Sequence, residues 1–221
     1  MKIKSLLLAL LSAVAADAQT YITHADVLDV NGEKILRDYT IVIRDGKIEQ
    51  VAPSSKVKPA KGAEVIDAKG KWVMPGMVDA HVHFFQTGGI HTRPDAIDLR
   101  AYKPYEEELA WYKENLDDQL RRYLSCGITT VIDDGATLEL LRQRDTFRTR
   151  HYTPRILMAG PLISTNYMPR SFEVLDEHNA PFYNVTTPEE AVAMTQKQYP
   201  YAPDFIKIWY ILLGPNKDSA A

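Results

Sequence analysis

The stretch MVDAHVHFF, residues 77–85, alternates polar and apolar side chains, which is typical of a β-strand with two different faces. His81 and His83 are two residues apart, so their side chains share a face with Asp79. Their Cα atoms lie about 6.6 Å apart in an extended chain, a span over which two imidazoles can bind one ion. Taken alone, the pair is also compatible with surface histidines or with hydrogen-bonded core histidines. The other face carries Val78, Ala80, Val82 and Phe84, which suits packing under helices.

Downstream of this strand, helix and strand patterns alternate. Helix patterns begin at Pro104, near residue 138 and near residue 187, and a long loop is expected over residues 161–186. The order β-α-β-α-β-α-β predicts parallel strands, in either an open doubly wound sheet or a (β/α)₈ barrel. No glycine-rich phosphate-binding fingerprint follows the first strand, which disfavours a dinucleotide-binding fold. The later expected strands are ITTVIDD (128–134), PRILMAG (154–160) and DFIKIWY (204–210).

Residues 20–75 differ in pattern, with short strands, no helix, and a change of character at Pro75-Gly76. Asp45-Gly46 separates two apolar runs, which is a strong β-hairpin signal, and Asn31-Gly32 offers a second turn. Several short strands of this kind predict part of a small β-sandwich.

Residues 1–18 have the three-part order of a secretory signal peptide. Lys2 and Lys4 precede an apolar run over residues 6–15, and Ala16-Asp17-Ala18 follows. The run is too short for a permanent membrane span. The alternative to a signal peptide is a buried amphipathic helix. We therefore expect cleavage after Ala18, a periplasmic or secreted protein, and no stable membrane anchor.

Charge and cysteine content exclude some function classes. The formal net charge is −3, so no basic surface indicates nucleic-acid binding. The single cysteine, Cys126, cannot form an internal disulfide and is interpreted as a small core residue.

The segment PDFIKIWY, residues 203–210, raises a question because it carries a lysine inside an apolar strand pattern. Phe205, Lys207 and Trp209 share one face, and neither face is polar. Lysine is almost never fully buried without a partner, because desolvating its ammonium group costs several kcal/mol. Lys207 is therefore paired with a carboxylate, extended out to solvent, or chemically altered.

Three stretches together resemble the amidohydrolase superfamily: KWVMPGMVDAHVHF (71–84), SCGITTVIDDG (125–135) and DFIKIWY (204–210). The resemblance covers residues 20 to about 213 and is closest to members similar to imidazolonepropionases and Xaa-Pro dipeptidases. It implies an α/β fold, the first half of a (β/α)₈ TIM-like barrel preceded by a small β-sandwich half-domain. In these terms, residues 1–18 are the signal peptide, 19–75 the N-terminal part of the sandwich, and 76–221 the first four barrel strands, truncated.

The resemblance also implies the chemistry. His81, His83 and Lys207 would be metal ligands in a site for two divalent ions, with Zn²⁺ as the expected metal. Lys207 would carry a CO₂-derived carbamate, an anion whose two oxygens can bridge the ions and whose formation removes the lysine's positive charge. Such enzymes hydrolyse C–N bonds in amides, cyclic amides or dipeptides by a metal-bridged hydroxide, so the expected partner is a small-molecule or dipeptide substrate.

Several parts of the family pattern have no counterpart in this sequence. A complete barrel has eight strands, whereas four are expected here, and the later metal histidines and the late catalytic aspartate have no candidates. Asp133 and Asp134 follow the second strand and cannot take that aspartate's role. We therefore interpret the chain as an N-terminal fragment that is inactive alone, with no catalytic residue assigned. The candidate substrate-binding residues are His91, Arg93 and Tyr210.

Two other function classes remain open at this stage. One is a secreted amidohydrolase-like protein that keeps the fold to bind a partner without catalysis. The other is a phosphotriesterase- or lactonase-type hydrolase, which would share the barrel and the lysine. The sequence does not fix the oligomeric state, the metal or the substrate.

Overall fold

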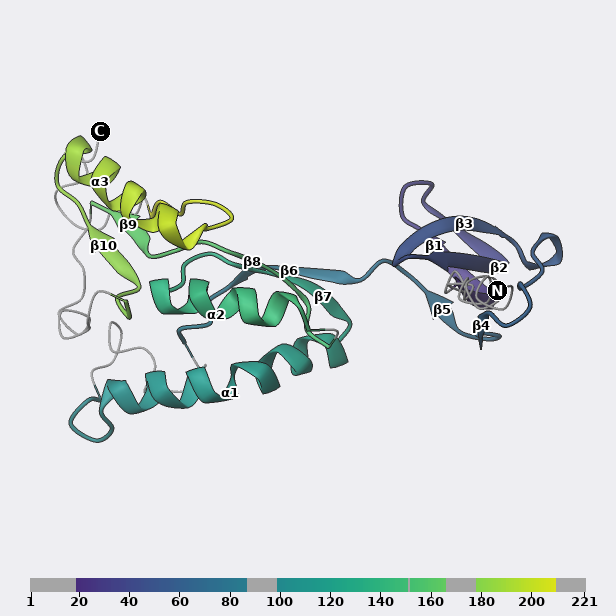
Figure 1. The fold of residues 1–221 in the computed structure, drawn as a ribbon, viewed down its shortest axis with the longest axis horizontal. Coiled ribbons are helices and arrows are strands. Elements are labelled where there is room, and N and C mark those ends of the chain that lie inside the picture. The colour runs from purple at the N-terminus through teal and green to yellow at the C-terminus, as the bar shows by residue number, and fades with distance from the viewer. Residues whose placement is uncertain (1–18, 87–98, 151, 166–177, 210–221) are drawn as a thin grey trace, which may run out of the picture. The chain divides into compact units, whose positions relative to one another are not determined.

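The computed structural model describes residues 19–86, 99–150, 152–165 and 178–209. The chain divides into two compact units, Met1–Pro75 and Gly76–Ala221, and each is described by itself (Figure 1). Within the described residues, no helix is both long enough and apolar enough to cross a membrane. The expected signal peptide, residues 1–18, lies outside the described residues.

The first unit is built on one mixed sheet of five strands with the order β3-β2-β1-β4, in which β5 pairs with a further part of β1. Neighbours β1, β2 and β3 are antiparallel, whereas β4 and β5 run parallel to β1. The described residues of this unit form a single sheet, so the second layer of the expected sandwich is not seen in them. The strands are β1 (Gln19–Asp29), β2 (Lys34–Arg44), β3 (Lys47–Pro53), β4 (Glu64–Asp67) and β5 (Trp72–Val73).

The hairpin predicted at Asp45-Gly46 is confirmed, because β2 and β3 pair around it in antiparallel register. Both turn residues have positive φ, 50° at Asp45 and 71° at Gly46, which is the geometry that matches the right-handed twist of a hairpin. The predicted turn at Asn31-Gly32 joins β1 to β2, and the Gly32 N–H donates to the Asp29 carboxylate at 3.0 Å.

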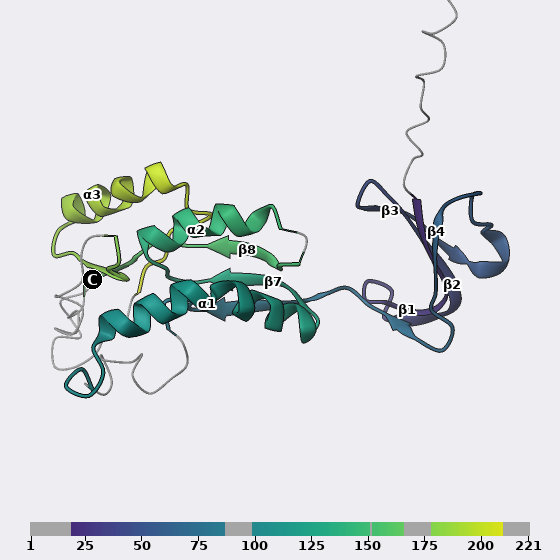
Figure 2. The ribbon, with the colours of Figure 1, turned by 60° about the horizontal axis from the view of Figure 1, so that its bottom comes forward.

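The second unit contains the expected parallel strands in the order β6-β7-β8, with two helices running along them (Figure 2). Helix α1 buries the predicted apolar stripe, which includes Leu109, Leu116 and Leu120. Helix α2 begins at the Thr137 cap, whose side chain accepts from the Leu140 N–H at 3.2 Å. The elements are β6 (Met77–Val82), α1 (Tyr105–Ser125), β7 (Ile128–Asp133), α2 (Leu138–Arg148) and β8 (Arg155–Met158).

The expected fourth strand differs from the prediction. Residues 204–209 make only two isolated parallel bridges, Ala159↔Phe205 and Ile163↔Ile208, and no regular ladder. The region expected to be a loop contains two short parallel strands, β9 (Leu162–Ser164) and β10 (Phe182–Asn184). The last helix, α3 (Pro188–Gln198), starts at the predicted Thr187 cap.

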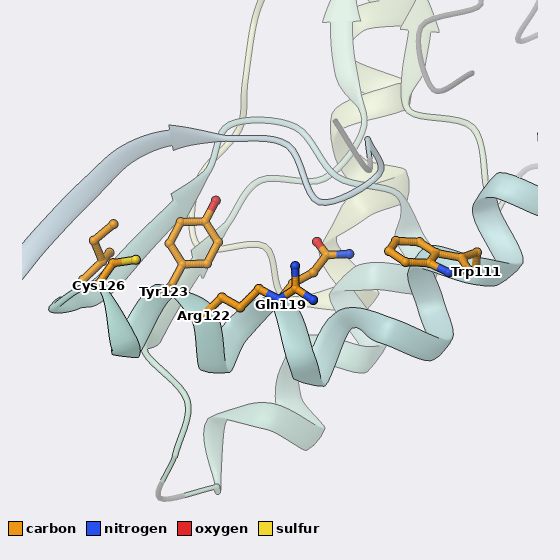
Figure 3. Close-up of a pocket in the computed structure, with 6 residues that line it drawn as sticks. Trp111, Gln119, Arg122, Tyr123 and Cys126 are labelled. Atoms are coloured by element: carbon orange, nitrogen blue, oxygen red, sulfur yellow. The ribbon is translucent and has the colours of Figure 1, made fainter. Parts of the chain in front are cut away.

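One side of α1 remains open in the described residues. A groove of about 290 Å³ runs along it, and Figure 3 shows Trp111, Gln119 and Tyr123 among its lining side chains. Met77 and Val78 on β6 are also exposed, at 47% and 56%. Strand β6 is thus an edge strand in the part of the chain that the structure describes, and Met77 and Val78 have no covering layer there, whereas Val82 is buried.

Candidate metal centre

The two histidines of the His-x-His pair converge on one point. His81 lies near the end of β6 and His83 just beyond it, and their Nε2 atoms are 3.3 Å apart. The rings meet edge to face, with centroids 5.2 Å apart. Two imidazole nitrogens bound to one tetrahedral Zn²⁺ at 2.0–2.1 Å would lie about 3.3 Å from each other. The pair therefore already has the separation that a shared zinc ion requires.

The hydrogen-bond partner of His83 fixes which ring nitrogen faces the cavity. Its Nδ1 lies 3.1 Å from the carbonyl oxygen of Gly135, which can only accept, so Nδ1 carries the hydrogen. In the neutral ring the lone pair is then on Nε2, which points at His81. Burial alone would lower the pKa of His83, but hydrogen bonds to Asp133 and Gly135 and the nearby carboxylate charges raise it above its ordinary value.

Asp133 holds the ends of β6 and β7 together. Its side chain is fully buried, and its two oxygens accept from the Phe84 N–H and the Gly135 N–H, both at 3.1 Å. The same carboxylate lies 3.7 Å from Nδ1 of His83. Burial raises the pKa of Asp133, although hydrogen bonds from His83 and Phe84 oppose that rise. Asp133 therefore sets the position of His83 without facing the cavity.

Asp134 is the charged partner of Lys207. The Lys207 ammonium donates to Oδ2 of Asp134 at 3.2 Å, and Nδ1 of His81 lies 3.5 Å from the same oxygen. Pairing with a carboxylate was one of the alternatives left open by the sequence. Pairing is combined with partial exposure, since 28% of the Lys207 side chain is accessible to solvent.

His81, His83 and Lys207 line one cavity of about 320 Å³. An aromatic wall, defined as Phe85, Phe182 and Trp209, also lines it, with ring centroids 6.3 Å apart for Phe85 and Phe182 and 5.3 Å apart for Phe182 and Trp209. The remaining lining residues are Gln86 and Leu162.

The structure brings together three of the residues singled out in the sequence, whereas His91, Arg93 and Tyr210 lie outside the described residues. In the described parts of the chain, no group of three or more His, Cys, Asp and Glu side chains is arranged to hold a metal. Sequence reasoning missed the role of Asp134. The sequence did contain a clue to this role. Asp134 follows the strand after the histidine strand, and residues at the carboxyl ends of neighbouring parallel strands should lie near the same site.

Comparisons with known proteins show which family the chain belongs to. The family model of the amidohydrolase family matches residues 72–207, which include both histidines and Lys207. The dihydroorotase of Anaeromyxobacter dehalogenans (strain 2CP-C) is 37% identical over 84 residues, which are 35% of this chain and 19% of that protein. The matched stretch is therefore a small part of that relative.

Solved structures match over nearly all of the chain. A Bifidobacterium longum protein described as a prolidase has a TM-score of 0.61 and 29% identity, covering 90% of this chain and 42% of that one. A prolidase in complex with N-methylphosphonate-L-proline has a TM-score of 0.65 and 25% identity, covering 86% and 46%. The chain thus spans less than half the length of these structures. Since the family model matches more than half of the chain and contains the paired histidines and Lys207, the chain belongs to the amidohydrolase family.

Proposed function

We propose that this chain provides one side of a binuclear metal centre in a hydrolase that cleaves C–N bonds of amides, cyclic amides or dipeptides. The observation that carries the proposal is the pair of Nε2 atoms of His81 and His83, 3.3 Å apart. The ring of His83 keeps its hydrogen on Nδ1, and the carboxylate of Asp134 near Nδ1 of His81 favours the same tautomer there. Two facing lone pairs would repel, so a close approach of this kind needs either a metal ion bound between the two Nε2 atoms or a hydrogen on one of them.

The family membership favours a metal ion over a proton. His81 and His83 would hold one ion, and Lys207 would contribute to both after its amine has reacted with CO₂. In that reaction the neutral amine nitrogen bonds to the carbon of CO₂ and loses a proton to solvent, which leaves a carbamate anion with two oxygens. When bound, the ions would activate a water molecule and polarise the scissile carbonyl.

Asp134 would respond to the change in charge at Lys207. In the described structure it neutralises an ammonium group at 3.2 Å. Once Lys207 becomes an anionic carbamate, Asp134 faces a like charge, which metal ions alone can balance. Carbamate formation and metal binding are therefore expected to occur together.

The aromatic wall indicates how a substrate would lie. Phe85, Phe182 and Trp209 offer an apolar surface in the same cavity as the histidines, which suits an apolar group next to the scissile bond. The solved prolidases and the dihydroorotase with which the chain shares sequence act, by their names, on small substrates, which supports a small-molecule or dipeptide substrate here.

Zinc binding to the 221-residue chain tests the proposal. His81→Ala and His83→Ala should each weaken zinc binding by at least about 100-fold, since losing even an outer-shell partner costs 10- to 100-fold. His24→Ala is the matched control, because His24 is an exposed histidine that pairs with Asp38 in the first unit. Equal zinc affinity in all three variants, measured by competition with a chromogenic chelator, would refute the metal centre. Turnover of dipeptides and cyclic amides, but not of phosphotriesters or lactones, by the metal-loaded protein would identify the bond.

Export is proposed on separate grounds, the lysine, apolar and Ala-x-Ala order of residues 1–18. Mass spectrometry of protein recovered from a bacterial periplasm should find Gln19, or its cyclised form, as the first residue. An intact Met1 on the exported protein would contradict this proposal.

A further inference from the structure

The Lys207 segment, defined as residues 204–209, is not held by a regular strand ladder. Its two bridges join Phe205 to Ala159 and Ile208 to Ile163. Phe205 and Ile208 are three residues apart, whereas their partners Ala159 and Ile163 are four residues apart. The pairing therefore contains an irregularity of one residue. A register set by only two bridges is weakly specified, and a slip of one residue would turn Lys207 to the opposite face. Something other than the ladder must hold the register.

Asp204 supplies a contact that a ladder would otherwise provide. Its backbone N–H donates to the Met158 carbonyl at 2.9 Å, and the Met158 N–H donates to Oδ2 of Asp204 at 2.9 Å. The side chain of Asp204 thus acts as the acceptor for a strand N–H that a backbone carbonyl would satisfy in a regular sheet. This reciprocal pair joins the start of the Lys207 segment to the end of β8.

Two arginines of α2 bind the same carboxylate. Arg144 Nη1 lies 3.0 Å from Oδ2 of Asp204, and Arg148 Nη2 lies 2.5 Å from both oxygens. Only 1% of the Arg144 side chain is exposed, and it also donates to the carbonyl of Ala202 at 3.0 Å. Arg148 donates to the carbonyl of Ile156 in β8 at 3.0 Å. The carboxylate therefore connects α2, β8 and the Lys207 segment.

The far end of the segment is held through the backbone around Lys207 itself. The Ile163 N–H donates to the Lys207 carbonyl at 3.1 Å, and the Trp209 N–H donates to the Ile163 carbonyl at 2.9 Å. Because these contacts are few, the direction of the Lys207 side chain depends on both ends of the segment being in place.

We propose that Asp204, held by Arg144 and Arg148, is a positioning residue that sets the register of the Lys207 segment and so directs the Lys207 amine towards Asp134 and the paired histidines. The proposal rests on the proposed function in one respect, the use of Lys207 at the metal centre. A buried guanidinium that loses a carboxylate partner is costly, and in any other register Arg144 would keep only the 60% exposed carboxylate of Asp145. The present register is therefore the favoured one.

Amide hydrogen exchange of the 221-residue chain tests the inference. Asp204→Asn should speed exchange of the Ile163 and Trp209 amides at least tenfold, because both amides lie in contacts that the register creates. The Val131 amide in β7, which pairs with strands on both sides, should change less than twofold. Asp145→Asn is the matched control, because Asp145 contacts Arg144 at 2.9 Å and Arg148 at 3.6 Å but is 60% exposed and bonds neither β8 nor the segment. It should change all three amides less than twofold.

A gentler variant keeps the test decisive if Asp204→Asn does not fold. Arg148→Lys keeps the charge but loses the two-oxygen contact, and it should speed the Ile163 and Trp209 amides at least threefold relative to Val131. Equal acceleration of all three amides in Arg148→Lys would show a general loss of stability and overturn the proposal. No acceleration in either variant would also overturn it.

A second measurement separates this inference from the proposed function. The complete, metal-loaded protein prepared with ¹³C-bicarbonate should give a carbamate NMR signal, reduced at least fivefold in Asp204→Asn and unchanged in Asp145→Asn. An unchanged signal in Asp204→Asn would overturn the positioning role. If no signal appears in the native protein, the carbamate in the proposed function is wrong, and the exchange measurements decide the positioning role by themselves.

Discussion

The two sides of the cavity are built in different ways. His81 and His83 lie at the end of β6, which is joined to β7 by a parallel ladder and by the buried Asp133. Lys207 lies in a segment with two isolated bridges, held mainly by side chains of α2. Backbone pairing between β6 and β7 positions the two histidines. Ionic contacts between residues far apart in the sequence position Lys207. The lysine side should therefore be the more sensitive to single side-chain changes.

The largest expected effect is at Lys207 itself. Under the proposed binuclear centre, Lys207→Ala should reduce the metal content of the metal-loaded protein from two ions to one, because the proposed bridging carbamate is lost. Short carboxylates such as acetate should restore part of the second ion's binding, since they can supply the missing oxygens. Lys197→Ala on α3 is the control and should keep both ions. Metal analysis after gel filtration makes the measurement, and two ions in Lys207→Ala would remove the carbamate from the account.

Asp133→Ala tests the histidine side. It leaves the buried N–H groups of Phe84 and Gly135 without their acceptor, so the free energy of unfolding should fall by about 2–5 kcal/mol. Asp134→Ala removes a partly exposed ion pair and should cost less than about 1 kcal/mol. Urea denaturation of both variants compares them. Similar losses would mean that Asp133 does not bind the two strand ends together as described.

Gly160→Ala tests the irregular pairing between the two bridges of the Lys207 segment, because Gly160 lies between the bridge residues Ala159 and Ile163. A Cβ at Gly160 would lie 2.2 Å from Oε1 of the buried Gln198, whose amide donates to the Pro161 carbonyl at 3.1 Å. Overpacking of this kind should cost about 1–3 kcal/mol. Ile163 and Trp209 amides should exchange faster than the Val131 amide in this variant. A fully stable Gly160→Ala chain would show that Gln198 moves aside freely.

The smallest expected effect concerns α3, the helix that carries Gln198. Hydrogen bonds from the Thr186 backbone and hydroxyl lower the pKa of Glu190 below its ordinary value of 4.5. A folded-state pKa below the unfolded one gives stability that is present above the unfolded pKa and is lost as the pH falls through the folded pKa. Glu190→Gln should therefore flatten the acid side of the stability profile, where the pH falls from the unfolded pKa through the lowered folded pKa of Glu190. An unchanged profile by thermal unfolding would show that the cap does not contribute.

The local features were predictable from the sequence because they depend on neighbours along the chain. Three features follow from spacing and residue type: the Asp45-Gly46 turn, the helix start near residue 187, and the strand that carries His81 and ends just before His83. The parallel order of β6, β7 and β8 also followed, since helical crossovers leave few alternatives. The strands β9 and β10 were missed, because three-residue strands carry too short a pattern to be recognised.

The sequence by itself determined that the side chains of two histidines point the same way and that Lys207 must be paired, reach solvent or be chemically altered. Only the tertiary structure decided that its partner is Asp134, because Asp134 lies 73 residues away and the contact depends on the Lys207 segment running next to the residues that follow β8. The same holds for Asp204, whose partners Arg144 and Arg148 lie on another element. Residue spacing governs contacts within one helix or strand, whereas pairings between charges on different elements exist only after the backbone has folded and excluded water around them.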